Sequence, residues 1–233
     1  MPAPKKSGLL PTATQPLPRV LLTGFEPFGD DRTTAQPVNP SWLAASALHG
    51  KRIKSHQIVA AELPCVFNAA ITELKELLRL HRPALVICVG QAGGRSAVSL
   101  ERIAININDA RIPDNAGSQP IDTPVHADGP PAYFGTLPIK AMLLAMQHAG
   151  IPAEVSQTAG TFVCNHVFYG LMHALATRRG LSKTRGGFIH VPLIPEQGSP
   201  ALPLDTLIGA LRVAVATALT TSTDRAVAAG AIS

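Results

Sequence analysis

The sequence predicts a single α/β domain built on a largely parallel, mixed and twisted sheet with helices on both faces. Short apolar runs of strand length alternate along the chain with helical patterns, as in folds with parallel strands. The 233 residues are enough for one well-buried core and few for two. Hydrophobic residues make up 46% of the chain, a content that excludes a disordered protein.

Five short apolar segments are predicted to be strands. The first enters a glycine-rich loop at Gly24. The third is apolar throughout, which is typical of a strand buried on both faces. The five segments are residues 20–22, 57–62, 84–89, 153–157 and 188–191.

Helices are predicted between these strands. Asn39 is a capping residue, Pro40 suits the first helical position and Gly50 suits the end, so a helix is predicted between them. Apolar residues at helical spacing indicate an amphipathic helix over residues 71–80. The remaining helices are predicted at residues 139–147, 163–177 and 204–219.

Three segments are predicted to lack regular structure. Residues 1–18 contain five prolines and no apolar period, which indicates a disordered leader. Residues 108–136 are rich in Pro, Gly, Asp and Asn, and ordered loops of this length are usually functional. Residues 222–233 are predicted to be a loose tail, so the folded domain spans residues 19–221.

Composition and charge favour a soluble cytoplasmic protein without a nucleic-acid or membrane partner. The apolar stretch near the N-terminus is too short for a signal peptide, and no segment approaches the roughly 20 apolar residues of a membrane span. Three widely spaced cysteines suit a reducing compartment better than a disulfide framework. The net charge of +5 permits weak attraction to polyanions, but the basic residues form pairs only and no nucleic-acid-binding motif accompanies them.

Cys164 is the first candidate catalytic residue. It lies in the segment Gly-Thr-Phe-Val-Cys-Asn, where a loop is predicted to become a helix. The free N–H groups and the dipole at a helix start favour an anion, so they lower the pKa of a thiol and make it nucleophilic. The alternative is a buried core cysteine, which is the commoner fate. Cys88 lies inside an apolar strand and is predicted to be core, whereas Cys65 lies at a strand end.

His190 is the candidate base. It lies near the end of a predicted strand, at the edge where the sites of α/β proteins form. Its ordinary pKa near 6.5 suits proton transfer. A structural histidine is the alternative. His166 and His173 compete for the role, but they lie on the helix that leads away from Cys164, which is a poor platform for a base.

Glu101 is the candidate partner of this base. A carboxylate among apolar neighbours is costly to bury unless it is paired. A carboxylate that accepts a hydrogen bond from an imidazole fixes the tautomer of the ring and stabilises its cation. The alternative is a surface salt bridge with the adjacent Arg102.

Other chemistries have weaker support in the sequence. The glycine-rich segment 90–95 follows a strand, but it lacks the Gly-Lys-Ser/Thr ending of a phosphate loop and the spacing of a dinucleotide site. No serine has the context Gly-x-Ser-x-Gly, and no His, Cys and acidic residues have the spacing of a metal site. We therefore predict neither a metal nor an organic cofactor.

Four stretches carry a family resemblance. They are Thr-Gly-Phe-Glu-Pro-Phe-Gly at 23–29 with Asn-Pro-Ser at 39–41, then residues 90–106, Asp-Ala-Arg-Ile-Pro-Asp-Asn at 109–115, and residues 160–169 with His-Val-Pro at 190–192. The spacing of Gly90 and Gly93 relative to Val-Ser-x-Glu-Arg-Ile-Ala-x-Asn at 98–106 is highly specific. Over residues 20–196 the chain closely resembles type I pyroglutamyl peptidases, also called pyrrolidone-carboxylate peptidases.

The resemblance implies a cysteine peptidase that removes an N-terminal pyroglutamyl residue from peptides through a thioester. The implied triad is Cys164, His190 and Glu101, with Arg111 beside the oxyanion. The walls and polar contacts of the slot for the lactam ring would come from Phe25, Phe28, Asn39, Gln91, Ile112, Phe162 and Val163. The resemblance also implies pyroglutamyl peptides as partners, no cofactor, and a homo-oligomer, either a tetramer or a dimer.

The chain departs from the family pattern at three places. Residues 30–38 form a longer connection than usual, which bears on the shape of the pocket and on Asn39, whose context also fits a helix N-cap. Residues 185–187 add positions before His190, and the proline-rich leader has no counterpart. Two alternative functions remain: a cysteine amidase that acts on another small cyclic amide, and a non-catalytic binding protein that has kept the fold.

Overall fold

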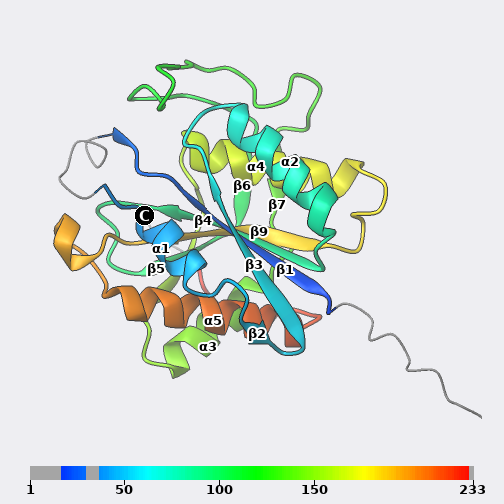
Figure 1. Ribbon diagram of the computed structural model, residues 1–233, viewed down its shortest axis with the longest axis vertical. Coiled ribbons are helices and arrows are strands. Elements are labelled where there is room, and N and C mark those ends of the chain that lie inside the picture. Colours follow the sequence, from blue (N-terminus) through cyan, green and yellow to red (C-terminus); the bar gives the residue numbers. More distant parts are fainter. Residues whose placement is uncertain (1–16, 30–36, 231–233) are drawn as a thin grey trace, which may run out of the picture.

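A seven-stranded sheet forms the centre of the protein (Figure 1). The computed structural model describes residues 17–29 and 37–230. The strands of this sheet are β1 (Arg19–Phe25), β2 (Arg52–Ile53), β3 (His56–Leu63), β4 (Leu85–Gln91), β5 (Val98–Glu101), β8 (Ala153–Ser156) and β9 (Arg185–Val191), in the order β2-β3-β1-β4-β9-β5-β8. Strands β3, β1, β4 and β9 are parallel, whereas β2 and β5 run antiparallel to β3 and β9. The predicted largely parallel, mixed sheet is confirmed.

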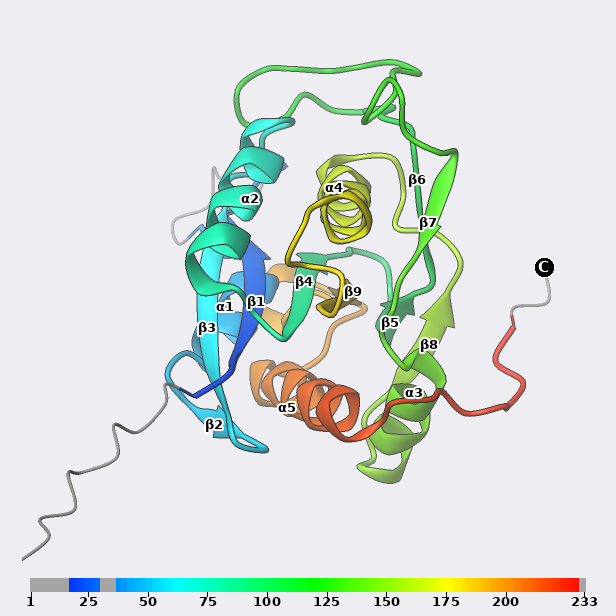
Figure 2. The ribbon, with the colours of Figure 1, turned by 90° about the vertical axis from the view of Figure 1, so that its right-hand side faces the viewer.

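Helices cover both faces of this sheet, as predicted (Figure 2). One face carries α1 (Pro40–Ser46), α3 (Ile139–His148) and α5 (Leu204–Thr220), and the other carries α2 (Ala69–His81) and α4 (Val163–Thr177). All five helices occur where the sequence predicts them. The first ends at Ser46, before the predicted end at Gly50, whose positive φ of 72° belongs to the turn that follows.

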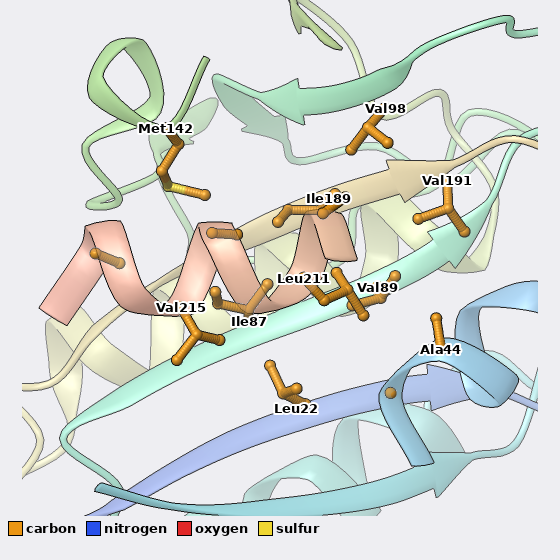
Figure 3. Close-up of a cluster of buried hydrophobic side chains, with 14 of the residues drawn as sticks. Leu22, Ala44, Ile87, Val89, Val98, Met142, Ile189, Val191, Leu211 and Val215 are labelled. Carbon is orange, nitrogen blue, oxygen red and sulfur yellow. The ribbon is translucent and has the colours of Figure 1, made fainter. Parts of the chain in front are cut away.

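Successive side chains of the central strands point to opposite faces of the sheet and so contribute to two separate hydrophobic cores. Ile87 and Ile189 point toward α5 and pack with Leu211 (Figure 3). Cys88 and Phe188 point to the opposite face, where they pack under α2 and α4. Cys88 is fully buried, so the prediction that it is a core residue is confirmed. Because side chains alternate along a strand, residues 90 and 190 face α4 as well.

The region predicted to be a long loop contains one short strand. This strand, β7 (Ala132–Phe134), pairs antiparallel with β6 (Ile103–Ile105), and the resulting ribbon packs against α4. The sequence predictions missed both strands, and they also missed β2 and β5. Each of the four has at most four residues, which is too few for an apolar period to be recognised.

The predicted leader and the longer connection at residues 30–38 fall mainly outside the described residues. Of the predicted leader, only Leu17 and Pro18 are described, and of the longer connection 30–38 only Pro37 and Val38. Among the helices of the described part of the chain, none has the length and apolar character needed to cross a membrane.

The C-terminal segment is attached to the domain. Residues 222–230 contain neither helix nor strand, in line with the irregular structure expected there. However, Asp224 accepts hydrogen bonds from the backbone N–H groups of Lys140 and Ala141 at 3.1 and 2.9 Å. The carboxylate therefore satisfies free donors in the first turn of α3.

Candidate active site

The candidate residues gather where the parallel strands β1, β4 and β9 end and α4 begins. Ligands of open α/β sheets bind at this edge because the loops that follow the strands meet there. Cys164 is the second residue of α4, and His190 is the last residue but one of β9. The two lie on the same side of the sheet because His190 faces α4.

A glycine gives the thiol room to approach the sheet. Gly90 pairs with His190 in the register of β4 and β9. A Cβ atom at Gly90 would lie 2.7 Å from Sγ of Cys164 and 2.9 Å from Cζ of Phe188, closer than real Cβ atoms come. The sulfur of Cys164 therefore occupies the space above Gly90, next to His190 in the sheet.

His190 and Glu101 form a buried pair. Nδ1 of His190 lies 2.8 Å from Oε1 of Glu101, and the side chains are 5% and 0% exposed. A carboxylate only accepts, so Nδ1 carries the proton and Nε2 is left as the ring atom that can take up another. The pairing depends on β5, which runs antiparallel to β9 and sets Glu101 opposite Phe188.

The salt bridge expected between Glu101 and its neighbour Arg102 does not form. Arg102 donates instead to the side chain of Gln157 at 2.8 Å. The cation that pairs with Glu101 is Arg95, whose Nη1 lies 2.7 Å from the same oxygen that accepts from His190. No signal in the sequence singled out Arg95, which lies in the loop between β4 and β5.

Burial favours the neutral forms of the candidate nucleophile and base. Loss of hydration raises the pKa of the Cys164 thiol to about 12, and the charge of Glu101 adds to this, whereas Arg95 lowers it. Burial also lowers the pKa of His190, although the hydrogen bond to Glu101 opposes this. The sequence analysis predicts a lowered thiol pKa, whereas in this free state loss of hydration shifts the pKa of Cys164 in the opposite direction. These directions favour a thiol and a neutral imidazole at rest.

The two competing histidines are held in other contacts. Nε2 of His166 accepts from the backbone N–H of Asn68 at 2.9 Å, and Nδ1 lies 2.9 Å from Oδ1 of Asn108. Both ring nitrogens of His166 are thus occupied, and burial lowers its pKa to about 4. His173 lies 3.0 Å from the hydroxyl of Tyr133. Neither ring is placed to serve Cys164.

A group of aromatic side chains packs against the same core cluster as Cys164. Phe28 and Phe162 are half-buried, with ring centroids 6.1 Å apart. Phe67, which the sequence analysis did not single out, meets Phe162 edge to face at 5.4 Å. Ile112 is 41% exposed and lies beside Gly29. Gly29 belongs to the same loop as Phe28. These side chains can form the walls of an apolar slot.

Two of the predicted wall residues are buried in the core instead. Phe25 is 2% exposed and packs against Phe188 at a centroid distance of 6.4 Å. Val163 is fully buried at the start of α4. Both side chains pack in the core next to the site, because β1 ends and α4 begins at the edge of the sheet where the site lies.

Asn39 has the N-cap role that its context also suggests. Its Oδ1 accepts from the backbone N–H and the hydroxyl of Ser41 at 3.0 and 2.7 Å, and its Nδ2 donates to the carbonyl of Glu26 at 3.1 Å. Asn39 is 2% exposed. It therefore joins the start of α1 to the loop that carries Phe28.

Gln91 ends β4 at the same edge and is held by a residue that the sequence analysis missed. Its Oε1 accepts from Nε2 of Gln197 at 3.2 Å. Gln197 is itself fixed, since its Oε1 accepts from the backbone N–H of Ile194 at 3.3 Å. Gln197 lies in a short 3₁₀ turn that follows β9, where no sequence pattern marks it.

Arg111 is exposed on the long loop and makes no side-chain hydrogen bond to a described residue. The loop nevertheless reaches the nucleophile. Thr161 donates its hydroxyl to the carbonyl of Asp109 at 2.7 Å, and Asp109 N–H donates to the carbonyl of Thr161 at 3.0 Å. These contacts fix the backbone near Arg111 to the segment just before Cys164.

The described residues hold no group of three or more His, Cys, Asp or Glu that could bind a metal ion.

Comparisons with known proteins agree with the resemblance found in the sequence. The family model described as pyroglutamyl peptidase matches residues 18–221. The pyrrolidone-carboxylate peptidase of Cupriavidus taiwanensis is 63% identical over 213 residues, which cover 89% of this chain and 96% of that protein. The crystal structure of Bacillus amyloliquefaciens pyroglutamyl peptidase I has a TM-score of 0.84 and 47% identity, covering 89% of this chain and 100% of that one. A mutant pyrrolidone carboxyl peptidase from Pyrococcus furiosus has a TM-score of 0.81 and 40% identity, covering 87% and 98%.

Proposed function

This chain belongs to the pyroglutamyl peptidase family of cysteine-type hydrolases, and we propose that it hydrolyses the amide bond after an N-terminal pyroglutamyl residue with a triad of Cys164, His190 and Glu101. The observation that carries the proposal is the buried contact of 2.8 Å between His190 Nδ1 and Glu101 Oε1. This contact lies beside the thiol that α4 presents, and it leaves Nε2 of the ring to exchange protons.

The first half of the reaction forms a thioester. Sγ of Cys164 attacks the pyroglutamyl carbonyl carbon while its proton passes to Nε2 of His190, because both groups are neutral at rest. The free N–H of Cys164 in the first turn of α4 donates to the oxyanion, with Arg111 beside it. The C–N bond then breaks, and His190 returns the proton to the leaving amine. Glu101 stabilises the imidazolium that exists between these steps.

The second half releases the acid. A water molecule gives its proton to His190 and attacks the thioester carbon. The C–S bond breaks, pyroglutamate leaves, and the thiolate regains the proton from the imidazolium. The balance of the two halves is one water consumed for one amide bond broken, with no redox step and no cofactor.

The surroundings of the thiol suit the substrate. A pyroglutamyl group has no charged α-amine and presents a flat, partly apolar ring, which calls for apolar walls with a few polar contacts. Phe28, Phe162 and Ile112 supply such walls, and Gln91 is the proposed polar contact. A polar group that pairs with the lactam rejects proline, which lacks the ring carbonyl, by roughly 10⁴-fold or more.

The test is the release of a fluorophore from a pyroglutamyl amide, run beside the prolyl analogue, with and without iodoacetamide. We expect rapid cleavage of the pyroglutamyl amide, no cleavage of the prolyl amide, and loss of activity on alkylation at Cys164, assigned by mass spectrometry. Cys164→Ser should be folded and almost inactive, whereas Cys88→Ala, at a buried core cysteine, should keep most of the activity.

Two outcomes would contradict the proposal. If folded, reduced protein leaves the pyroglutamyl amide intact but cleaves another small cyclic amide, the protein is a different cysteine amidase. If it cleaves neither and Cys164 reacts no faster than free cysteine, a binding role replaces catalysis.

The proposal includes the setting of the enzyme. We expect a cytoplasmic homo-oligomer, a tetramer or a dimer, that acts on pyroglutamyl peptides with each site inside one subunit. Light scattering after size-exclusion chromatography measures the assembly. Activity that is independent of protein concentration across its dissociation would support a site contained in one subunit.

A further inference from the structure

Arg95 joins the two halves of the candidate site. Its Nη1 donates to Oε1 of Glu101 at 2.7 Å, and its Nη2 donates to the backbone carbonyl of Thr158 at 3.1 Å. Thr158 belongs to the segment between β8 and α4, six residues before Cys164. One guanidinium therefore contacts both the partner of the base and the loop that leads to the nucleophile.

The carboxylate of Glu101 depends on this contact. The Glu101 side chain is fully buried, and a buried carboxylate is costly unless a cation and hydrogen bonds compensate it. His190 supplies a hydrogen bond, but its resting ring is neutral. Oε2 of Glu101 has no hydrogen-bond partner among the described residues. Arg95 is thus the charge that compensates Glu101, and it acts through the same oxygen, Oε1, that orients His190.

The geometry of the two contacts suits arginine in particular. A guanidinium presents donors in a fixed fork, so one nitrogen can hold a carboxylate while the other holds a carbonyl. A lysine ammonium is a compact point charge on a flexible stem. The Arg95 side chain is 25% exposed, so its charged group lies between solvent and the buried Glu101.

We propose, on the basis of the function proposed above, that Arg95 is a positioning residue that keeps the carboxylate of Glu101 oriented toward His190 and ties this pair to the loop before Cys164. Arg95 does not touch the reacting atoms in this role; it acts through Glu101.

The charge of Arg95 also acts on the nucleophile and base. It lowers the pKa of both Cys164 and His190. The groups that face His190 are Glu101 from β5, Arg95 from the β4–β5 loop, and the thiol from α4. Loss of the cation should therefore move both titrations to higher pH, since protonated His190 and neutral thiol are each favoured once it is gone.

The first test is activity in three variants. Arg95→Met removes the charge at similar length, and we expect kcat/KM to fall about 10- to 100-fold, mainly in kcat, as for loss of one charged hydrogen bond. Arg95→Lys keeps the charge but not the fork, so a smaller loss is expected. Arg102→Gln is the matched control, because Arg102 also bridges to the β8–α4 loop, through Gln157, without touching Glu101. It should keep wild-type activity.

The second test separates positioning from general stability and needs no substrate. The rate of Cys164 alkylation by iodoacetamide is measured from pH 4 to pH 9, below the pKa of the thiol, so that the acid limb of the profile reports His190, whose neutral ring takes the proton of the thiol. Arg95→Met should shift the profile to higher pH, whereas Arg95→Lys and Arg102→Gln should leave it in place. Millimolar methylguanidine should restore part of the activity of an Arg95→Ala variant, because the truncated side chain leaves room for a guanidinium at this partly exposed position.

Three results would overturn the inference. They are wild-type kinetics in Arg95→Met, an equal loss in Arg102→Gln, and a profile that drops at every pH without moving. If Arg95→Met does not fold, wild-type kcat in Arg95→Lys would overturn the bridging role. If the wild-type protein cleaves no pyroglutamyl amide, the proposed function fails, while the alkylation profile still decides the role of Arg95.

Discussion

Two histidines on the same side of the sheet, His190 and His166, show how the partner of an imidazole decides its use. Nδ1 of His190 meets the carboxylate of Glu101, and Nδ1 of His166 meets the amide oxygen of Asn108, at 2.8 and 2.9 Å. Both rings are buried and both have a lowered pKa. The distances and burial of the two pairs are thus nearly the same.

The two histidines differ in the charge of the side chain that contacts Nδ1 and in whether Nε2 already accepts a hydrogen bond. Glu101 can stabilise an imidazolium, whereas a neutral amide oxygen gives much less support to a cation. Nε2 of His166 accepts from the backbone N–H of Asn68, so a proton at that atom would break a hydrogen bond. His166 is therefore a structural residue that must stay neutral. In the proposed mechanism, His190 gains and loses a proton.

The largest expected effect comes from replacing each ring. His190→Asn should lower kcat/KM about 10³-fold or more, because no other group takes the proton of the thiol. His166→Gln should keep activity within about fivefold, since a glutamine can both accept from Asn68 and donate to Asn108. Steady-state kinetics with the pyroglutamyl amide measures both. Equal losses in the two variants would erase the functional distinction between the rings.

The next effect is on stability as a function of pH. The folded-state pKa of His166 is about 4 against an ordinary 6.5. The unfolded chain therefore binds the proton first, and stability is fully present above pH 6.5 and lost as the pH falls toward 4. This difference between the folded and unfolded pKa values of His166 corresponds to about 3 kcal/mol of unfolding free energy. The lowered pKa of His190 acts in the same direction.

Urea unfolding at pH 7.5 and pH 4.5 measures this loss. His166→Gln should lose distinctly less stability between the two pH values than the wild type, because its side chain does not titrate. Parallel losses in both proteins would mean that His166 is not the group that destabilises the fold in acid.

A smaller effect is expected when the space that Gly90 leaves for the thiol of Cys164 is filled. Gly90→Ala would place a methyl group 2.7 Å from Sγ of Cys164, so the sulfur or the chain must move. We expect kcat to fall about 10- to 100-fold, since misplacement by about 1 Å has a cost of this order. Gly93→Ala is the control, because its nearest neighbour would lie 3.9 Å away. Normal kcat in Gly90→Ala would show that the thiol does not depend on this space.

Local patterns predicted the main elements of the fold but not the contacts between them. The helix that presents Cys164 and the strand that carries His190 both follow from apolar period and length. Strand β5 escaped notice because four residues are too few, and its antiparallel pairing with β9 spans a long stretch of chain. The alternative partner suggested for Glu101, Arg102, was wrong for this reason: which arginine reaches the carboxylate depends on how β5 turns its side chains.

Other site residues carried no signal at all. Phe67 lies in a turn after β3, and Gln197 lies in a 3₁₀ turn after β9, where neither has a periodic neighbour. Their contacts with Phe162 and Gln91 arise only when distant segments meet. Conversely, Phe25 looked like a pocket wall from its motif, but it is a core residue because it ends a strand that is buried on both faces.

The place of β9 in the sheet has a consequence for synthesis of the chain. In the observed strand order, β9 is the link between β2-β3-β1-β4 on one side and β5-β8 on the other. It is also the last strand of this sheet to leave the ribosome. Glu101 belongs to one part, Gly90 to the other, and His190 to β9 itself. A growing chain therefore cannot form the contact between His190 and Glu101 until β9 has joined the two parts of the sheet, so the proposed site is completed only after nearly the whole domain has been synthesised.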